Sequence, residues 1–221
     1  MKNYIVIAAY NEEKAIKNVL LNLKKYCANI VVVDDGSCDS TFDIARQCQV
    51  EVLRHIINRG QGAALKTGID YALKNGADVV VTFDADGQMN PEEIKKVAMP
   101  VILRECDIVL GSRFLGKTNI SFFRKIILKL AVLFTYITSG VGLTDAHNGF
   151  RAISASALRK MDLRQDKMAH ASEIINEIGR KNLKYKEVPV TVNYTEYSLK
   201  KGQKISGAFK IVLDLVFGKF K

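Results

Sequence analysis

The sequence lacks several features that would point to common classes of protein. It has no tryptophan and only three histidines (His55, His147 and His170), whose spacing is not that of metal ligands. Its four cysteines form no C-x-x-C pair, so we expect reduced thiols and a cytosolic protein. It has no uncharged apolar run of about 18 residues, which predicts that no helix spans a membrane. It also has no nucleic-acid motif with aromatic platforms, so we expect no nucleic acid partner.

What the chain does contain is typical of one globular domain. It has 221 residues, of which 48% are hydrophobic and 25% charged, enough for a substantial core. The apolar run Tyr4–Ala9 is too short for a signal peptide. The formal net charge of +10 favours polyanions such as anionic lipid or phosphorylated substrates, or it serves solubility alone. Basic residues gather at Arg113–Lys129, at Arg180–Lys186 and from Lys200 onward.

Short runs rich in Val and Ile alternate with helical patterns in the first half. The expected strands are Tyr4–Ala9, Ile30–Asp34, Val50–Arg54, Val79–Phe83 and Asp107–Leu110. The expected helices are Glu12–Tyr26, Ser40–Cys48, Gly62–Lys74 and Pro91–Arg104. Continuous apolar strands between helices predict an α/β fold with a mostly parallel, Rossmann-like central sheet that helices cover on both faces.

Polar clusters follow four of these strands at their carboxyl ends. They are Tyr10-Asn11-Glu12-Glu13, Asp34-Asp35-Gly36-Ser37, Asp84-Ala85-Asp86-Gly87-Gln88 and Gly111-Ser112-Arg113. Ligands of open α/β sheets bind beyond the carboxyl ends of the strands, so we expect the four clusters to share one functional rim. Each cluster alone is also compatible with a turn or a helix cap, and we interpret Asn11 as a cap.

The pair Asp84 and Asp86 is the strongest candidate for a metal site. An ionised carboxylate is costly to bury unless it is paired or bound to a metal. Side chains two residues apart in an extended segment point the same way, so both carboxylates can reach one divalent cation. A polar loop after a strand is the alternative. The nearby Gly60 and Gly62 precede a helix and would let the backbone approach a diphosphate, although G-x-G alone is a weak pattern.

The second half carries amphipathic segments. Residues 120–143 are apolar but interrupted by basic residues, which predicts one or two amphipathic interface helices too broken to span a bilayer. A helix is expected around Ala171–Lys181 and a strand at Glu187–Tyr194. We divide the chain into a domain of residues 1–203 and a basic amphipathic helix of residues 204–221. That helix is expected at a membrane surface, and packing on the core is the alternative.

Six motifs in order carry a resemblance to a known family. They are Ala8-Ala9-Tyr10-Asn11-Glu12-Glu13, Asp34-Asp35-Gly36-Ser37, Asn58-Arg59-Gly60-Gln61-Gly62, Asp84-Ala85-Asp86-Gly87-Gln88, Gly111-Ser112-Arg113 and Asn148-Gly149-Phe150-Arg151. Residues 1 to about 195 resemble the family-2 glycosyltransferases with the GT-A fold. Within that family, the chain is most similar to the polyprenyl-phosphate (dolichol-phosphate) mannose and glucose synthases.

The resemblance implies how the nucleotide sugar is bound. Ala8, Tyr10 and Glu12 would line the nucleoside, with Glu12 near the ribose, and Asp35 would hydrogen-bond the base. The carboxylates Asp84 and Asp86, with Gln88, would hold Mg²⁺ or Mn²⁺ against the diphosphate. Many family members have proline at the position of Ala8.

The resemblance also implies how the acceptor is bound. Arg113 and Arg124 match arginines at the acceptor phosphate, and Lys201 and Lys204 are candidates for a basic position in the family's tail. Asp145 resembles an aspartate close to the reacting centre. Glu173 matches an acidic position of the family whose role is unclear.

The implied activity is metal-dependent, inverting transfer of a hexose from a nucleotide sugar of the UDP-glucose or GDP-mannose type to polyprenyl phosphate. Attachment to the cytoplasmic face of a membrane would be peripheral, through amphipathic segments or a membrane-protein partner.

A phosphate acceptor is largely dianionic near neutrality and needs cations, not a base. A sugar hydroxyl on a glycan is the alternative acceptor and needs a carboxylate base within about 3 Å. Asp145 is the leading candidate for that base, although it is equally a candidate for orienting an arginine. A third hypothesis is a non-catalytic module that binds a membrane or a polyanion.

Overall fold

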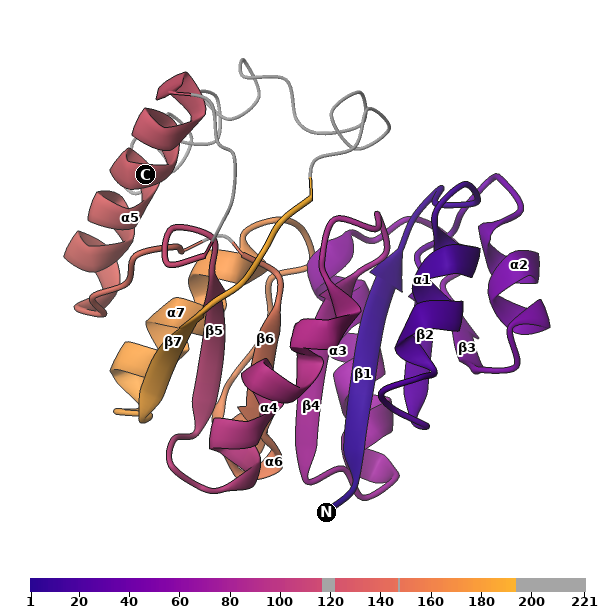
Figure 1. Cartoon of the computed structure of the whole chain (residues 1–221), viewed down its shortest axis with the longest axis horizontal. Coiled ribbons are helices and arrows are strands. Elements are labelled where there is room, and N and C mark those ends of the chain that lie inside the picture. The colour runs from indigo at the N-terminus through magenta and orange to yellow at the C-terminus, as the bar shows by residue number, and fades with distance from the viewer. Residues whose placement is uncertain (117–121, 147, 194–221) are drawn as a thin grey trace.

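The centre of the molecule is a seven-stranded sheet. The computed structural model describes residues 1–116, 122–146 and 148–193 (Figure 1). The strands are β1 (Asn3–Ala9), β2 (Ile30–Asp34), β3 (Glu51–Arg54), β4 (Val79–Asp84), β5 (Ile108–Ser112), β6 (Arg151–Ser154) and β7 (Tyr185–Pro189). Their order is β3-β2-β1-β4-β6-β5-β7, and every neighbouring pair is parallel except those of β6, which is antiparallel to β4 and β5. The prediction of a mostly parallel sheet is confirmed.

Helices cover both faces of this sheet, as predicted. They are α1 (Ile16–Leu23), α2 (Thr41–Gln47), α3 (Gln61–Lys74), α4 (Ile94–Ile102), α5 (Phe122–Ser139), α6 (Ala155–Lys160) and α7 (His170–Arg180), with a 3₁₀ turn, η1, at Pro91–Glu93. One hydrophobic cluster joins α1, α2 and α4 to the sheet, and a second joins α3, α6 and α7 to the opposite face. Because both faces are covered, the central strands are buried along almost their whole length, which explains their runs of valine.

Three local features differ from the sequence-based expectation. Strand β6 was not expected, because its four residues begin at the last residue of the Asn-Gly-Phe-Arg motif and are too few for a period-two pattern. Helix α1 begins at Ile16 instead of Glu12, after a turn in which Asn11 has a φ of 53°. The interpretation of Asn11 as a helix cap is wrong: its Oδ1 accepts a hydrogen bond from the backbone N of Cys38 at 2.9 Å, which ties two rim loops together.

The amphipathic region after β5 forms the single helix α5. It packs on α7 and rises beyond the sheet at the end where the loops gather (Figure 1). Strand β7 ends at Pro189, earlier than expected, and the chain then crosses to the loop after β4, where the backbone N of Asn193 donates to the carbonyl of Gln88 at 2.8 Å. Among the described residues, no helix is long and apolar enough to cross a membrane. The expected helix of residues 204–221 lies outside them.

The carboxyl ends of β1, β2, β4 and β5 lie at one edge of the sheet. The parallel register pairs Ala9 with Asp34 and Ala8 with Asp84. Strand β5 points the same way as β4, because β6 is antiparallel to both. The prediction of a shared rim is therefore confirmed.

Candidate active site

A cavity of about 100 Å³ opens at this rim between the ends of β4 and β5. It is lined by Asp84, Asp86, Gln88, Met89, Arg113, Asn148, Gly149 and Val192. The two carboxylates predicted to bind metal and the arginine predicted to bind phosphate therefore face the same space, although they are separated in sequence. The side chain of Asn148 was not among the predicted site residues.

Hydrogen bonds fix the two carboxylates on the β4 side of the cavity. Asp84 Oδ1 accepts from Gln61 Nε2 at 3.1 Å. Asp86 accepts from Gln88 twice, from the backbone N at 3.0 Å and from Nε2 at 2.5 Å. Gln88 thus orients Asp86, which is a role that the sequence did not predict.

The electrostatics of the carboxylates favour a bound cation. Burial, together with the nearby charge of Asp86, raises the pKa of Asp84 to about 7, while Arg151 and Arg113 oppose the shift. Burial also lowers the pKa of the Arg151 guanidinium to about 10, against the pull of Asp84 and Asp145. A divalent cation between Asp84 and Asp86 would remove the repulsion that raises the pKa of Asp84.

The donor set fits a hard divalent cation that keeps part of its coordination for other ligands. The oxygens available are those of Asp84, Asp86 and Gln88, which suit Mg²⁺ or Mn²⁺ better than a soft metal. In the described part of the chain, no group of three or more His, Cys, Asp or Glu side chains forms a closed metal site. The remaining ligands would therefore come from water or from a substrate, as expected for a cation that binds phosphates.

On the β5 side of the cavity, Arg113 forms a buried ion pair with Asp145. The Nε of Arg113 lies 2.6 Å from Asp145 Oδ2, Nη2 lies 3.3 Å from Oδ1, and the backbone N also donates to Oδ2. The two residues are only 9% and 3% exposed. Glu187 of β7 accepts from the backbone N of Thr144 and of Asp145, which holds the turn that carries the aspartate.

Asp35, the residue predicted to contact the base, has its carboxylate largely engaged within the protein. Oδ1 accepts from the backbone N of Arg59 at 3.0 Å and lies 2.7 Å from His55 Nδ1, and Oδ2 accepts from the backbone N of Gly60 at 2.7 Å. Asp35 therefore fixes the loop before α3. Its contact with a base stays a prediction.

The other residues predicted to bind the nucleoside lie at the end of β1. Ala8 is partly buried and Tyr10 is exposed. Glu12 is buried, and its backbone N donates to Thr41 Oγ1 at 2.7 Å. Strands β1 and β4 are neighbours, so these residues lie beside the carboxylate pair.

Comparison with known proteins identifies the family. Residues 4–162 match the model of glycosyl transferase family 2. The chain belongs to glycosyltransferase family 2. It is 36% identical to a UDP-N-acetylglucosamine–dolichyl-phosphate N-acetylglucosaminyltransferase of Methanococcus voltae, over 98% of this chain and 95% of that protein. It is 30% identical to a polyprenol monophosphomannose synthase of Mycolicibacterium smegmatis, over 90% of this chain and 79% of that protein.

Solved structures confirm the GT-A fold of this glycosyltransferase. Glucosyl-3-phosphoglycerate synthase from Mycobacterium tuberculosis, solved in complex with Mn²⁺ and UDP, superposes with a TM-score of 0.74 and 16% identity. The match covers 98% of this chain and 79% of that one. At this identity the similarity bears on the fold alone.

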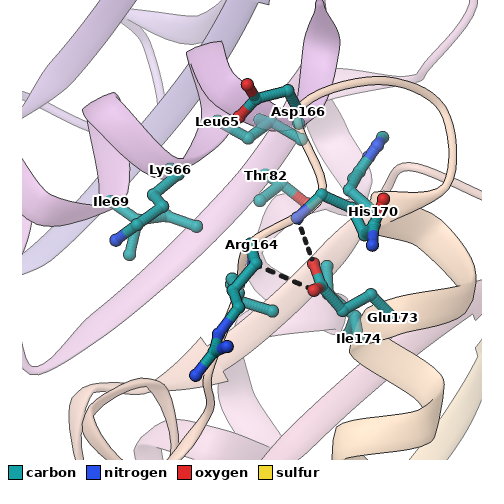
Figure 2. Close-up of a pocket in the computed structure, with 12 residues that line it drawn as sticks. Leu65, Lys66, Ile69, Thr82, Arg164, Asp166, His170, Glu173 and Ile174 are labelled. Carbon is teal, nitrogen blue, oxygen red and sulfur yellow. Dashed lines mark hydrogen bonds between the residues drawn. The ribbon is translucent and has the colours of Figure 1, made fainter.

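The glycosyltransferase also has a second, smaller cavity behind the sheet, between α3 and α7 (Figure 2). There Glu173 accepts from the backbone N of Arg164 at 2.9 Å and of Gln165 at 3.0 Å. The acidic residue whose role was unclear thus holds the loop that precedes α7.

The same loop explains the G-x-G pattern. A Cβ at Gly62 would lie 2.0 Å from the carbonyl oxygen of Gln165, and one at Gly60 would lie 2.5 Å from that of Asp166. The two glycines therefore admit this loop, and the idea that they admit a diphosphate is not needed to explain them.

Several predicted residues lie outside the described part of the structure. Arg124 falls in the first turn of α5, but its side chain is outside the described residues, as are Lys201, Lys204 and His147. Their proposed roles stay predictions. Asn148 and Arg151 were visible in the sequence only as parts of a motif. Arg151 reaches the site because β6 pairs with β4, and Asn148 lines the cavity three residues before it.

Proposed function

We propose that this glycosyltransferase moves a hexose from a nucleotide sugar, of the UDP-glucose or GDP-mannose type, to polyprenyl phosphate with inversion at the anomeric carbon. The observation that carries the proposal is the cavity in which Asp84 and Asp86 face Arg113. One side suits a cation and the diphosphate that leaves, and the other suits a second phosphate that attacks. Two relatives named for dolichyl-phosphate and polyprenol monophosphate chemistry support a lipid phosphate as the acceptor.

The carboxylate side would stabilise the leaving group. Asp84, Asp86 and Gln88 would hold Mg²⁺ or Mn²⁺, which acts as a Lewis acid that offsets charge on the leaving diphosphate. Gln61 and Gln88 keep the two carboxylates in place before the substrate arrives, so little reorganisation is needed.

The arginine side would place the acceptor. A phosphate monoester is largely dianionic near neutrality, so its oxygen can attack the anomeric carbon without a general base. Two hydrogen bonds from the guanidinium of Arg113 to Asp145 fix the guanidinium, and the backbone N of Arg113 donates a third. These contacts favour a role for Asp145 in orienting Arg113, and they do not favour a role as a general base. Arg124, Lys201 and Lys204 would add positive charge at the same phosphate.

An exposed apolar face of α5 supports the proposal that the protein binds a membrane surface. Ile126, Leu130, Leu133 and Ile137 repeat at helical spacing on one side of α5 and are 43–73% exposed, with exposed Lys129 at the edge of the stripe. A long-chain lipid phosphate presents its head group at a bilayer surface, and an amphipathic helix binds there through its apolar face. We infer peripheral attachment to the cytoplasmic face of the membrane, through α5 and the basic tail.

The test is a donor panel. Purified protein is incubated with Mn²⁺ and short-chain polyprenyl phosphate in detergent, with UDP-glucose, UDP-N-acetylglucosamine or GDP-mannose, and the lipid is analysed by mass spectrometry. We expect one donor to give a lipid heavier by one sugar residue. Failure of every donor, with a folded protein that binds Mn²⁺, would contradict the proposed function.

A further inference from the structure

The side chain of Asn148 carries a hydrogen-bond donor that nothing in the described part of the protein uses. Asn148 lines the cavity of the site and is 5% exposed. Its Nδ2 atom is buried and has no hydrogen-bond partner among the described residues. Leaving a buried amide donor unpaired costs free energy, so such a group in a cavity calls for an explanation.

The orientation of the amide is set by the backbone. Asn148 Oδ1 accepts from the backbone N of Phe150 at 3.0 Å. Turning the amide over would place its NH₂ against that N–H group, so the donor end cannot exchange with the acceptor end without losing this bond. Arg151 Nε donates to the carbonyl of Asn148 at 3.0 Å and holds the backbone from the other side. The Asn148 amide is therefore fixed before any ligand binds.

Asn148 lines the cavity that the two halves of the reaction would share. The next residue, Gly149, packs so closely on the carboxylate of Asp84 that a Cβ there would lie 2.7 Å from both oxygens. Arg113 lines the same cavity. The space between the leaving diphosphate and the attacking phosphate is where the transferred sugar must lie.

The chemistry of the amide suits a neutral oxygen. The two phosphates of the proposed reaction are served by charged groups: a cation at Asp84 and Asp86, and the guanidinium of Arg113. An uncharged NH₂ group adds directional recognition without further charge. A site built around such a donor rejects an analogue that lacks the matching hydroxyl, because the donor then stays unpaired.

We propose that Asn148 Nδ2 donates a hydrogen bond to a hydroxyl of the sugar being transferred, and so helps to select that sugar. The proposal rests on the proposed function, because it requires a nucleotide sugar in this cavity. Asn148 would be a specificity residue for the donor, whereas Asp84 and Asp86 bind the diphosphate part that all nucleotide sugars share.

The test compares binding of each nucleotide sugar with binding of its free nucleoside diphosphate. Isothermal titration with Mn²⁺ gives the Kd of UDP-glucose, UDP-N-acetylglucosamine and GDP-mannose, and of UDP and GDP, for the wild type and Asn148→Ala. We expect the variant to lose about tenfold in affinity for the preferred nucleotide sugar and to bind the free diphosphate within about twofold of the wild type. If Asn148 had a merely structural role, the variant would lose affinity for the nucleotide sugar and for the free diphosphate to the same extent.

The chain offers a matched control. Asn90 Oδ1 accepts from the backbone N of Glu92 two residues later, in the same type of turn that Asn148 makes with Phe150. Asn90→Ala should leave both affinities unchanged. If Asn148→Ala is too unstable, Asn148→Ser keeps a hydroxyl oxygen that can accept from the Phe150 N–H. It lacks the amide NH₂ group, so the same loss is expected.

The outcomes separate the two proposals. Equal losses for sugar and diphosphate, or no loss at all, would overturn the role of Asn148 and leave the proposed function standing. If the wild type binds Mn²⁺ and none of the three nucleotide sugars, the proposed function fails and this role fails with it. A deoxy sugar that lacks the contacted hydroxyl should bind wild type and Asn148→Ala equally well.

Discussion

Arg113 and Asp145 form a buried ion pair in which the arginine Nε lies 2.6 Å from the aspartate Oδ2. The aspartate lies 32 residues beyond the arginine in sequence, and Glu187 of a neighbouring strand holds its turn in place. Removing either partner would break the hydrogen bonds of a buried ion pair, so the two residues should act as one unit.

The first prediction is that Arg113 and Asp145 serve the acceptor together. Arg113→Ala should raise the KM for polyprenyl phosphate about 10- to 100-fold, equivalent to about 1.5–3 kcal/mol, and change the KM of the nucleotide sugar by less than about twofold. Asp145→Ala should act similarly, and the double variant should be no worse than Arg113→Ala. Arg164→Ala, which removes an exposed arginine behind the sheet, serves as the control. Additive losses, or a raised donor KM with an unchanged acceptor KM, would refute the shared role.

The second prediction concerns the metal. Asp86→Ala should abolish transfer and weaken Mn²⁺ binding at least about tenfold, because the variant loses one of two carboxylate ligands. Electron paramagnetic resonance of added Mn²⁺ measures that binding. Asp70→Ala removes an exposed carboxylate of α3 and should change neither quantity. Turnover of Asp86→Ala near the wild-type rate would show that this carboxylate does not hold the metal.

The third prediction uses the raised pKa of Asp84. Its pKa is about 7 in the folded protein and about 3.9 in an unfolded chain. As pH rises from about 4 through 7, the unfolded state gives up the proton first, so metal-free protein should lose stability over that range. The full effect is at most about 4 kcal/mol. Asp84→Asn lacks this titration, so its stability relative to the wild type should be greater at pH 8 than at pH 5.

Urea unfolding of wild type and Asp84→Asn at both pH values, with and without Mn²⁺, measures the effect. Added Mn²⁺ should stabilise the wild type most at pH 8, where Asp84 is ionised, and should have little effect on the variant. A stability difference that is the same at pH 5 and pH 8 would contradict the burial of an ionisable carboxylate beside Asp86.

The fourth prediction concerns the exposed stripe of α5. Replacing Leu133 and Ile137 with glutamate should reduce binding to vesicles of anionic phospholipid by at least about tenfold, because each change puts a charge where apolar side chains would enter the bilayer surface. Thermal unfolding should barely change, since both side chains are more than half exposed. Lys160→Glu, on α6 at the other end of the sheet, controls for charge alone. If the double variant binds vesicles as well as the wild type does, α5 does not form part of the membrane-binding surface.

The sequence predicted the sheet and the polar rim at its carboxyl edge well, for a physical reason. Strands such as Ile30–Asp34 are buried on both faces, so their apolar runs are continuous and end abruptly in polar rim residues. The parallel arrangement then brings Asp35 and Asp84 to one edge.

What the sequence did not predict depends on contacts between distant segments. Strand β6 has too few residues to show a pattern, and its pairing with β4 brings Arg151 close to Asp84. Likewise, nothing local in the sequence links Glu173 to the loop at Arg164, or Gly62 to Gln165. For such residues the sequence shows the type of side chain, but it does not show which distant residue that side chain contacts.

The dependence of transfer on the acceptor, measured with a labelled donor, tests the proposed function. Wild-type protein with Mn²⁺ and the preferred radiolabelled nucleotide sugar is given either polyprenyl phosphate or the matching polyprenol, and the label in the organic phase is counted. We expect label in the lipid with polyprenyl phosphate, no transfer to polyprenol, and a strong loss in Arg113→Ala. Equal transfer to both lipids, or transfer to a soluble sugar hydroxyl alone, would contradict it.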